Sequence, residues 1–315
     1  MKHAPVWLIW LLSVVPSFGQ TDRLPIIDVH LHSRSLAALK AQGPNPITGT
    51  KPPGSVEEHM KQTLAIMDQY NIVLGIVSGG SRDLRALEGP TQFKKRAPDR
   101  IWAAPAFGKP VLGVEELRSL YKSGDLSAMG EITAQYEGLS PSDMSLEPYF
   151  ALAESLDIPV GIHTGLSFPG ITQMGFPEFR VSLGNPVLFE ELLNRHPKLR
   201  VWLMHAGWPF LAETIGILNV YPQVYVDIAV INWIRPREEF YSYLKELVKS
   251  GFGNRIMFGS DQMSWPDAIG MAVESIQRAD FLSEQEKRDI LYNNAARFLK
   301  LTPDQITKHH QDLSK

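Results

Sequence analysis

The stretch Ile26–His32, which reads IIDVHLH, joins a run of branched apolar residues to a pair of histidines. Branched side chains favour a buried strand, and alternate residues of a strand point to the same side. His30 and His32 are therefore expected to project together from the carboxyl end of this strand. In a chain with nine histidines, a His-x-His pair is weak evidence by itself, and its place at a strand end is what makes it informative.

Apolar runs like the first part of this stretch, Ile26–Val29, recur along the chain and are separated by amphipathic segments. The further predicted strands are Ile72–Val77, Ile101–Ala106, Leu126–Ile132, Pro159–Ile162, Leu199–Met204, Val224–Ile228 and Arg255–Gly259. The predicted helices are Val56–Tyr70, Glu115–Lys122, Leu146–Leu156, Pro186–His196, Pro209–Val220, Pro236–Lys249 and Trp265–Arg278. Strands that alternate with helices predict an α/β protein, a single-domain (β/α)8 TIM barrel. A doubly wound open sheet is the alternative.

The composition describes an ordinary globular chain of 315 residues, 44% hydrophobic and 21% charged. A net charge of −3 gives no reason to expect a nucleic-acid partner. The chain has no cysteine, which excludes disulfides, thiolate nucleophiles and cysteine-bound zinc. The sequence also has no Gly-x-Ser-x-Gly motif, so a serine nucleophile of that kind is excluded too.

Residues 1–19 are expected to form a signal peptide. Lys2 supplies a positive start, the apolar run 6–15 is too short to span a membrane, and Ser17 and Gly19 are small residues before the expected cut. Residues 20–315 would then be the barrel domain of a secreted or periplasmic protein without stable membrane anchoring. A retained N-terminal anchor is the alternative.

Two connections are longer than the fold requires, Ser33–Gly54 and Thr164–Asn185. Long connections without helices or strands of their own inside a compact domain are usually functional. Neither is expected to contain regular structure.

Metal-binding side chains gather at the predicted strand ends. His163 closes the fifth strand, His205 follows the sixth, Glu131 ends the fourth and Asp261 follows the eighth. The carboxyl ends of barrel strands meet on one face, where barrel enzymes carry their active sites. Imidazole and carboxylate ligands suit zinc or another borderline divalent ion. The sequence therefore predicts a metal centre on this face.

With these residues located, the chain resembles the metal-dependent amidohydrolase superfamily, and within it the amidohydrolase-2 group of (β/α)8 enzymes. Four stretches carry the resemblance: IIDVHLH at 26–32, HAGWP at 205–209, GSD at 259–261 and ILYNNAARFL at 290–299. They extend over nearly the whole chain after the expected signal peptide, and their order and spacing are specific.

The resemblance implies roles for individual residues. His30 and His32 would bind the more buried metal with Asp261, which would also take a proton from bound water. His163 and His205 would hold a second metal or, in single-metal members, would be one ligand and one imidazole that polarises the substrate.

In two-metal members the fourth strand supplies a bridging carboxylate, and Glu131 stands in that place. Decarboxylating members generally lack such a bridge, so Glu131 favours hydrolysis. The alternative is that Glu131 pairs with an arginine at the rim of the barrel.

The expected cofactor is one or two divalent ions, zinc first and manganese as the alternative. A divalent ion lowers the pKa of bound water from about 16 to about 7, and Asp261 can then accept the proton and pass it to the leaving group. The leading hypothesis is hydrolysis of a small ester, lactone or amide, cyclic or carboxylated. The alternatives are a metal-dependent decarboxylase or hydratase and, from another class, a non-catalytic binding barrel.

The substrate is expected to be a small molecule, held by side chains near the strand ends. Arg34 faces the same side as His32 and can clamp a carboxylate. The other candidates for substrate binding are Tyr136, Trp208 and Arg235. Aromatic side chains in the long connections would also suit an interface, so a homo-oligomer is a further expectation.

Overall fold

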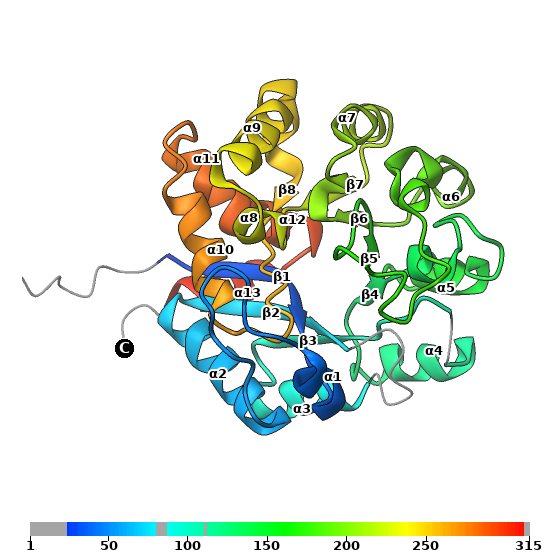
Figure 1. Cartoon of the computed structure of the whole chain (residues 1–315). Helices are drawn as coiled ribbons and strands as arrows, with labels where there is room; N and C mark the ends of the chain where they lie inside the picture. The colour runs from blue at the N-terminus through cyan, green and yellow to red at the C-terminus, as the bar shows by residue number, and fades with distance from the viewer. Residues whose placement is uncertain (1–23, 80–86, 110–111, 312–315) are drawn as a thin grey trace, which may run out of the picture.

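The computed structural model describes residues 24–79, 87–109 and 112–311, so the expected signal peptide lies outside the described residues. In the described part of the chain, eight strands stand around a centre, and most helices lie outside them (Figure 1). The strands are β1 (Ile26–His32), β2 (Ile72–Ser78), β3 (Ile101–Ala104), β4 (Met129–Ile132), β5 (Val160–His163), β6 (Val201–Met204), β7 (Val224–Asp227) and β8 (Ile256–Met257). Each predicted strand is present, and the (β/α)8 barrel prediction is confirmed.

The strands pair in sequence order and are parallel, in one sheet of β1-β2-β3 and one of β4 to β8. Irregular backbone hydrogen bonds join the two sheets. Between β3 and β4, the N–H of Gly130 donates to the carbonyl of Pro105 at 2.9 Å. Between β8 and β1, the N–H of Val29 donates to the carbonyl of Phe258 at 3.0 Å, and the N–H of Asp261 donates to the carbonyl of His30 at 2.8 Å. The barrel is thereby closed, and Asp261 is held beside His30.

Each of the seven predicted helical segments contains an α-helix, with small shifts of the ends, except that residues 186–189 of the predicted helix Pro186–His196 form a 3-10 turn. The α-helices of the described residues are α1 (Leu36–Ala41), α2 (Val56–Gln69), α3 (Glu88–Arg96), α4 (Val114–Lys122), α5 (Glu147–Ser155), α6 (Glu190–Arg195), α7 (Leu211–Val220), α8 (Ile231–Ile234), α9 (Arg237–Leu247), α10 (Ala268–Gln277), α11 (Glu284–Arg288), α12 (Asn294–Phe298) and α13 (Pro303–Gln311). Shorter helical turns are η1 (Ala134–Glu137), η2 (Val181–Gly184), η3 (Pro186–Phe189), η4 (His205–Gly207), η5 (Val248–Phe252), η6 (Gly253–Arg255) and η7 (Asp289–Asn293).

Local sequence explains where several helices begin. Ser55 precedes α2, and its hydroxyl accepts a hydrogen bond from the N–H of Glu58 at 3.1 Å. Ser283 caps α11 in the same way, and the Glu286 carboxylate accepts a hydrogen bond from the N–H of Ser283 at 2.7 Å. These caps satisfy N–H groups that have no partner within the helix.

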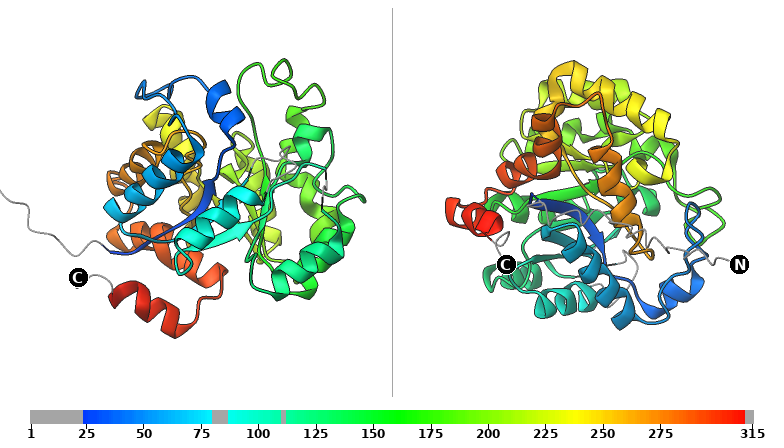
Figure 2. Two further views of the ribbon diagram at one scale, coloured as in Figure 1. Left: turned by 90° about the horizontal axis from the view of Figure 1, so that it is seen from below. Right: turned by 90° about the vertical axis from the view of Figure 1, so that its left-hand side faces the viewer.

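The two long connections were predicted to lack regular structure, and this prediction is wrong in part. The connection after β1 contains α1, because Ser35 caps a short apolar segment there. The connection after β5 contains η2. Both lie at one end of the barrel, and α13 lies at the other end (Figure 2). The connections therefore stand at the end to which β1 and β5 point with their carboxyl termini.

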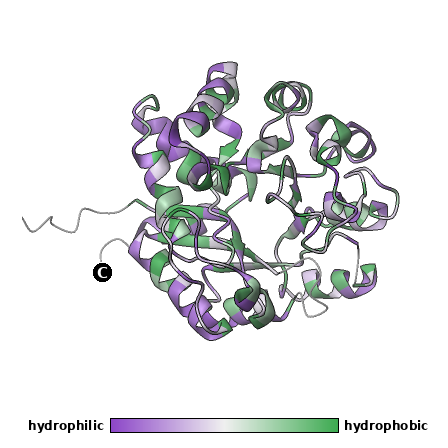
Figure 3. Cartoon of the chain, viewed as in Figure 1, coloured by the Kyte–Doolittle hydropathy of each residue, from purple (hydrophilic) through white to green (hydrophobic). Residues whose placement is uncertain are grey.

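Apolar side chains fill the space between the strands and the surrounding helices, and the hydrophilic residues lie mainly on the outer helix faces (Figure 3). A second apolar cluster joins β1, β2 and β6 to the C-terminal segment through Trp202, Tyr292 and Phe298. Within the described ranges, no helix combines the length and apolar character needed to cross a membrane.

Candidate metal centre

The six side chains predicted as metal ligands meet at the carboxyl ends of the strands. They come from β1, β4, β5, the turn η4 directly after β6, and the segment after β8. Each residue is between 1% and 9% exposed. The residues are His30, His32, Glu131, His163, His205 and Asp261. The structure thus brings together the whole predicted set, whose roles as ligands stay predictions.

One half of the site is built on β1. Nε2 of His30 lies 3.2 Å from Nε2 of His32, because alternate residues of the strand point into the barrel. Oδ1 of Asp261 lies 3.1 Å from His32 Nε2 and 3.9 Å from His30 Nε2. These three side chains bring one ligand-type atom each within 4.8 Å of one another.

The other half is built on β5 and the end of β6. Nε2 of His205 lies 3.1 Å from Nδ1 of His163. Oε1 of Glu131 lies 2.6 Å from His163 Nδ1 and 3.5 Å from His205 Nε2. These three residues form a second group with ligand-type atoms within 4.8 Å of one another.

Glu131 belongs to both halves. Its second oxygen, Oε2, lies 3.5 Å from His32 Nε2 and 3.9 Å from His30 Nε2. Burial opposes ionisation of Glu131, but hydrogen bonds from His163 and His205 outweigh this effect and hold its pKa well below the usual range. Glu131 is therefore an anion that faces both histidine pairs.

Asp261 is the second anion of the site. Burial raises its pKa, but the attraction of His30 and the contact with His32 outweigh burial and lower the pKa below its ordinary value. Two ionised carboxylates in a buried site require compensating positive charge, since burying an unpaired anion is costly.

The donor set fits a divalent cation. In each of the four imidazoles, one ring nitrogen contacts an oxygen outside the ligand set and is called the outer nitrogen here; the other is the inner nitrogen. The outer contacts are His30 Nδ1 with Asp227 Oδ2, His32 Nδ1 with Ser78 Oγ, His163 Nε2 with the Leu166 carbonyl and His205 Nδ1 with the Ala229 carbonyl. Once the inner nitrogen has given up its proton, an outer N–H that donates to oxygen leaves the lone pair on the inner nitrogen. The inner nitrogens then face one another in pairs, at 3.1 and 3.2 Å, beside two carboxylates. A bound cation would relieve the repulsion of these lone pairs, and outer N–H contacts of this kind orient metal-binding histidines generally.

The predicted substrate residue Arg34 lies near the two anions. Its Nε atom is buried and has no hydrogen-bond partner among the residues that the structure describes. Burial lowers the pKa of Arg34, and the charges of Asp261 and Glu131 oppose this change. The guanidinium is thus within electrostatic reach of the site.

Tyr136, in η1, lies against the second half of the site. Its ring packs edge-on against His163 with 4.9 Å between the ring centroids, and its hydroxyl lies 2.7 Å from Ser167 Oγ. Burial raises the pKa of Tyr136, so the hydroxyl keeps its proton at neutral pH. It can therefore donate a hydrogen bond.

Trp208 and Arg235 contact each other. The Arg235 guanidinium lies 4.2 Å from the Trp208 ring centroid, and it forms an ion pair with Glu239 at 2.9 Å. These partners compete with any substrate, and the roles of both residues in substrate binding stay predictions.

Sequence reasoning missed two residues that hold the site. Asp227 ends β7, and its Oδ2 atom lies 3.0 Å from His30 Nδ1. The side-chain amide of Gln262 makes two hydrogen bonds to the backbone of His32. Its Oε1 accepts from the N–H of His32 at 3.0 Å, and its Nε2 donates to the carbonyl of His32 at 2.7 Å. The sequence did contain a signal for Asp227, because it is a carboxylate at the end of an apolar predicted strand, as Glu131 is. Gln262 had none apart from its place beside Asp261.

Comparison with known proteins gives a family match and several structural matches. Residues 27–301 match the sequence model of the family described as Amidohydrolase. Protein fluG of Emericella nidulans is 24% identical over 176 residues, which are 50% of this chain and 19% of fluG, so this chain spans about a fifth of that relative.

Two solved structures with the same fold have low sequence identity. Dihydroxybenzoic acid decarboxylase from Polaromonas sp. JS666, with bound manganese, matches at 15% identity and a TM-score of 0.64, covering 90% of this chain and 99% of that chain. A protein described as a probable 2-pyrone-4,6-dicarboxylic acid hydrolase from Acinetobacter baumannii matches at 16% identity and a TM-score of 0.61, covering 88% and 99%.

Proposed function

The chain belongs to the amidohydrolase family, and from this membership we propose that it is a metal-dependent hydrolase of a small ester, lactone or amide. The observation that carries the proposal is the position of Glu131. One oxygen of its carboxylate faces His163 and His205, and the other faces the two histidines of β1. A bridging carboxylate between two ions requires this arrangement.

In this proposal His30, His32 and Asp261 would hold one divalent ion, His163 and His205 would hold the other, and Glu131 would be shared between the two sites. Bound divalent ions supply Lewis acidity, which activates water and stabilises negative charge on a carbonyl oxygen. Zinc is the proposed metal because nitrogen and carboxylate ligands suit it, and manganese is the alternative.

Asp261 does the proton transfer. Its lowered pKa keeps the carboxylate ionised at neutral pH, so it can accept a proton from the attacking water. The same oxygen then returns the proton to the leaving group. His205 presents Nε2 to the second half of the site, where it acts as a ligand or, with a single ion, polarises the substrate carbonyl.

Arg34 and Tyr136 are proposed to bind the substrate. A guanidinium whose buried Nε atom has no hydrogen-bond partner among the described residues suits a carboxylate, which it can bind through two parallel hydrogen bonds. Arg34→Met should raise KM for carboxylated substrates about 10-fold or more and leave KM for neutral esters within about twofold. Equal effects on both substrate classes would contradict this role. Trp208 and Arg235 are proposed as more distant contacts.

A decarboxylase is the second candidate. It is supported by similar solved structures described as dihydroxybenzoate or dihydroxybenzoic acid decarboxylase, one of them with manganese, and by the buried, unpartnered Nε atom of Arg34 among the described residues. A decarboxylase would use one ion, and Glu131 would then turn away from the site and not act as a bridge.

The deciding experiment measures the metal content of protein purified without chelator or nickel, by elemental mass spectrometry. Two ions per chain would support the bridge and direct the substrate search to lactones, esters and amides. One ion per chain would favour decarboxylation or hydration. Protein that cannot take up any divalent ion would overturn the proposal and favour a non-catalytic binding barrel.

Export is also part of the proposal. Removal of residues 1–19 would place the barrel in the periplasm or outside the cell, with a small molecule as substrate and self-association as a further expectation. Mass spectrometry of the protein from its native host would show whether the mature chain begins at Gln20.

A further inference from the structure

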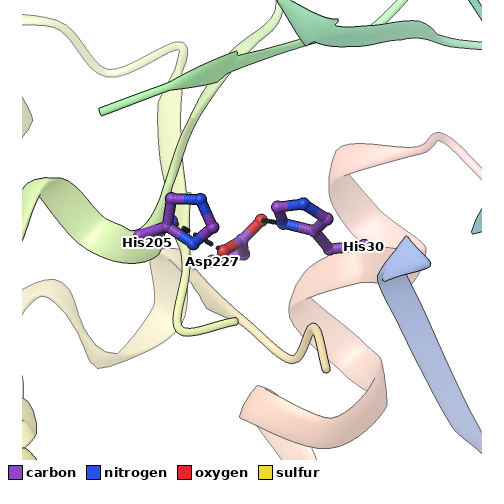
Figure 4. A group of neighbouring side chains, drawn as sticks. All are labelled: His30, His205 and Asp227. Atoms are coloured by element: carbon purple, nitrogen blue, oxygen red, sulfur yellow. Dashed lines mark hydrogen bonds and ion pairs between the residues drawn. The ribbon is translucent and has the colours of Figure 1, made fainter. Parts of the chain in front are cut away.

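We propose that Asp227 is a positioning residue that fixes the metal-binding nitrogens of His30 and His205 together and does not itself bind metal. This inference rests on the proposed metal centre. Its geometry invites the opposite reading, because His30, His205 and Asp227 bring ligand-type atoms within 4.8 Å of one another (Figure 4).

The hydrogen bonds of Asp227 distinguish the two roles. Oδ1 accepts from the backbone N–H of His205 at 2.9 Å and from that of Ala229 at 3.0 Å. Oδ2 accepts from Nδ1 of His30 at 3.0 Å and from Nε1 of Trp202 at 3.1 Å. A carboxylate has about four acceptor positions, and four N–H groups occupy them. Because all four positions are occupied, Asp227 has no lone pair directed into the site.

Glu131 and Asp261 differ from Asp227 in this respect. Their oxygens face the inner nitrogens of the histidines, the atoms that would bind metal. The Asp227 oxygens instead face an outer nitrogen, an indole N–H and two backbone N–H groups. Of these three carboxylates, Glu131 and Asp261 are therefore placed as ligands and Asp227 as a support.

The contact with His30 determines which nitrogen of that imidazole is available. A carboxylate accepts only from N–H, so Nδ1 of His30 carries the proton. In the neutral imidazole, the form that can bind metal, the lone pair is then on Nε2, which faces His32, Glu131 and Asp261.

Asp227 acts on His205 through the backbone. It holds the N–H of Ala229, and the carbonyl of Ala229 lies 3.1 Å from Nδ1 of His205. A carbonyl also accepts only from N–H, so His205 likewise presents Nε2 to the site. One carboxylate at the end of β7 thereby sets one histidine in each half of the metal centre.

The experiment compares Asp227→Asn with the full-length wild-type chain by chelator competition for zinc. An amide places an NH2 group against N–H donors in either orientation, so His30 or the His205–Ala229 backbone loses its acceptor. We expect metal affinity to fall about 10- to 100-fold with the number of ions at saturation unchanged. Unchanged affinity would overturn the proposal, and a lower number of ions with the remainder bound tightly would make Asp227 a ligand.

Glu154→Gln is the matched control, because Glu154 also contacts a buried histidine, His196, at 3.0 Å but lies outside the site. It should leave zinc affinity within about twofold. A general effect of lost carboxylate–histidine pairs would instead weaken zinc binding in both variants.

A spectrum of the wild-type protein tests whether His30 and His205 bind metal through Nε2. It does not depend on whether Asp227→Asn folds. In the zinc-loaded protein, nitrogen-15 NMR should show the His30 and His205 imidazoles with Nδ1–H and with zinc on Nε2. Zinc on Nδ1 of either residue would overturn the proposal. Failure of wild-type protein to bind zinc or manganese would contradict the proposed function itself, a distinct outcome.

Discussion

Nδ1 of His163 lies 2.6 Å from Oε1 of Glu131, while the other oxygen of Glu131 faces the histidines of β1. A bridging role needs both oxygens as acceptors, and an amide offers only one. Glu131→Gln should therefore lower the metal content from two ions to one per chain and reduce hydrolysis about 10- to 100-fold, as elemental analysis and a kinetic assay would measure. Two ions and full activity would count against the bridge. Glu115→Gln, on an exposed carboxylate, is the control.

Asp261→Asn should leave the fold and most of the metal in place and reduce kcat by about 10²- to 10⁴-fold. The physical reason is that the amide oxygen can still bind a cation but cannot take up a proton at neutral pH. Circular dichroism, metal content and kcat together check the prediction. A variant with wild-type kcat would remove Asp261 from the mechanism.

Metal binding should release protons. Burial lowers the pKa of His30, but the charges of Asp227 and Asp261 outweigh burial and raise this pKa well above its ordinary value of 6.5. In metal-free protein His30 is thus protonated at neutral pH, and a metal must displace that proton. Affinity should rise with pH until the pH exceeds the pKa of His30. Calorimetry at pH 7 in two buffers of different ionisation enthalpy measures the release, and no net release would contradict the assignment.

His59 should make the folded state sensitive to mild acid. It is 0% exposed, its Nε2 lies 2.8 Å from the Met263 carbonyl, and burial lowers its pKa to about 4. In the unfolded chain His59 takes up a proton near pH 6.5, whereas in the folded state it does so only near pH 4. The stability that neutral His59 gives the folded state is therefore complete above pH 6.5 and is lost as the pH falls toward 4. The loss amounts to about 3 kcal/mol at most.

The test of His59 is a comparison of urea unfolding for wild type and His59→Gln between pH 7 and pH 4.5. Other acidic groups titrate in both proteins, so their effect cancels in the difference. The stability advantage of the wild type should shrink as the pH falls. A difference that stays constant over this range would contradict the prediction.

Gly161→Ala should destabilise the barrel. A Cβ atom at position 161 would lie 2.3 Å from the indole ring of Trp202, which is buried and donates to Asp227. Moving the indole costs about 1–3 kcal/mol of unfolding free energy and disturbs the support of His30. Gly216→Ala, in α7, is the control, since nothing lies within 4 Å of its Cβ position. Urea unfolding should show a loss for Gly161→Ala only.

Much of the site could be predicted because its residues follow a local rule. His30 and His32 are two positions apart on one strand, so they share a face whatever the rest of the fold does. His163, His205 and Asp261 each follow an apolar run, and the carboxyl ends of barrel strands meet on one face. The prediction failed where local signals were weak, as in the connection after β1, where Ser35 caps the short helix α1.

The sequence by itself determined the order of strands and helices, the barrel, and the set of side chains at the strand ends, because periodicity and turn residues act over a few positions. Only the tertiary structure decided which atoms face one another. Asp227 lies 197 positions after His30, the Trp208 ring that contacts Arg235 follows a different strand, and the histidines that face the two oxygens of Glu131 also come from other elements. Such contacts arise from packing between distant segments, and no local pattern encodes them.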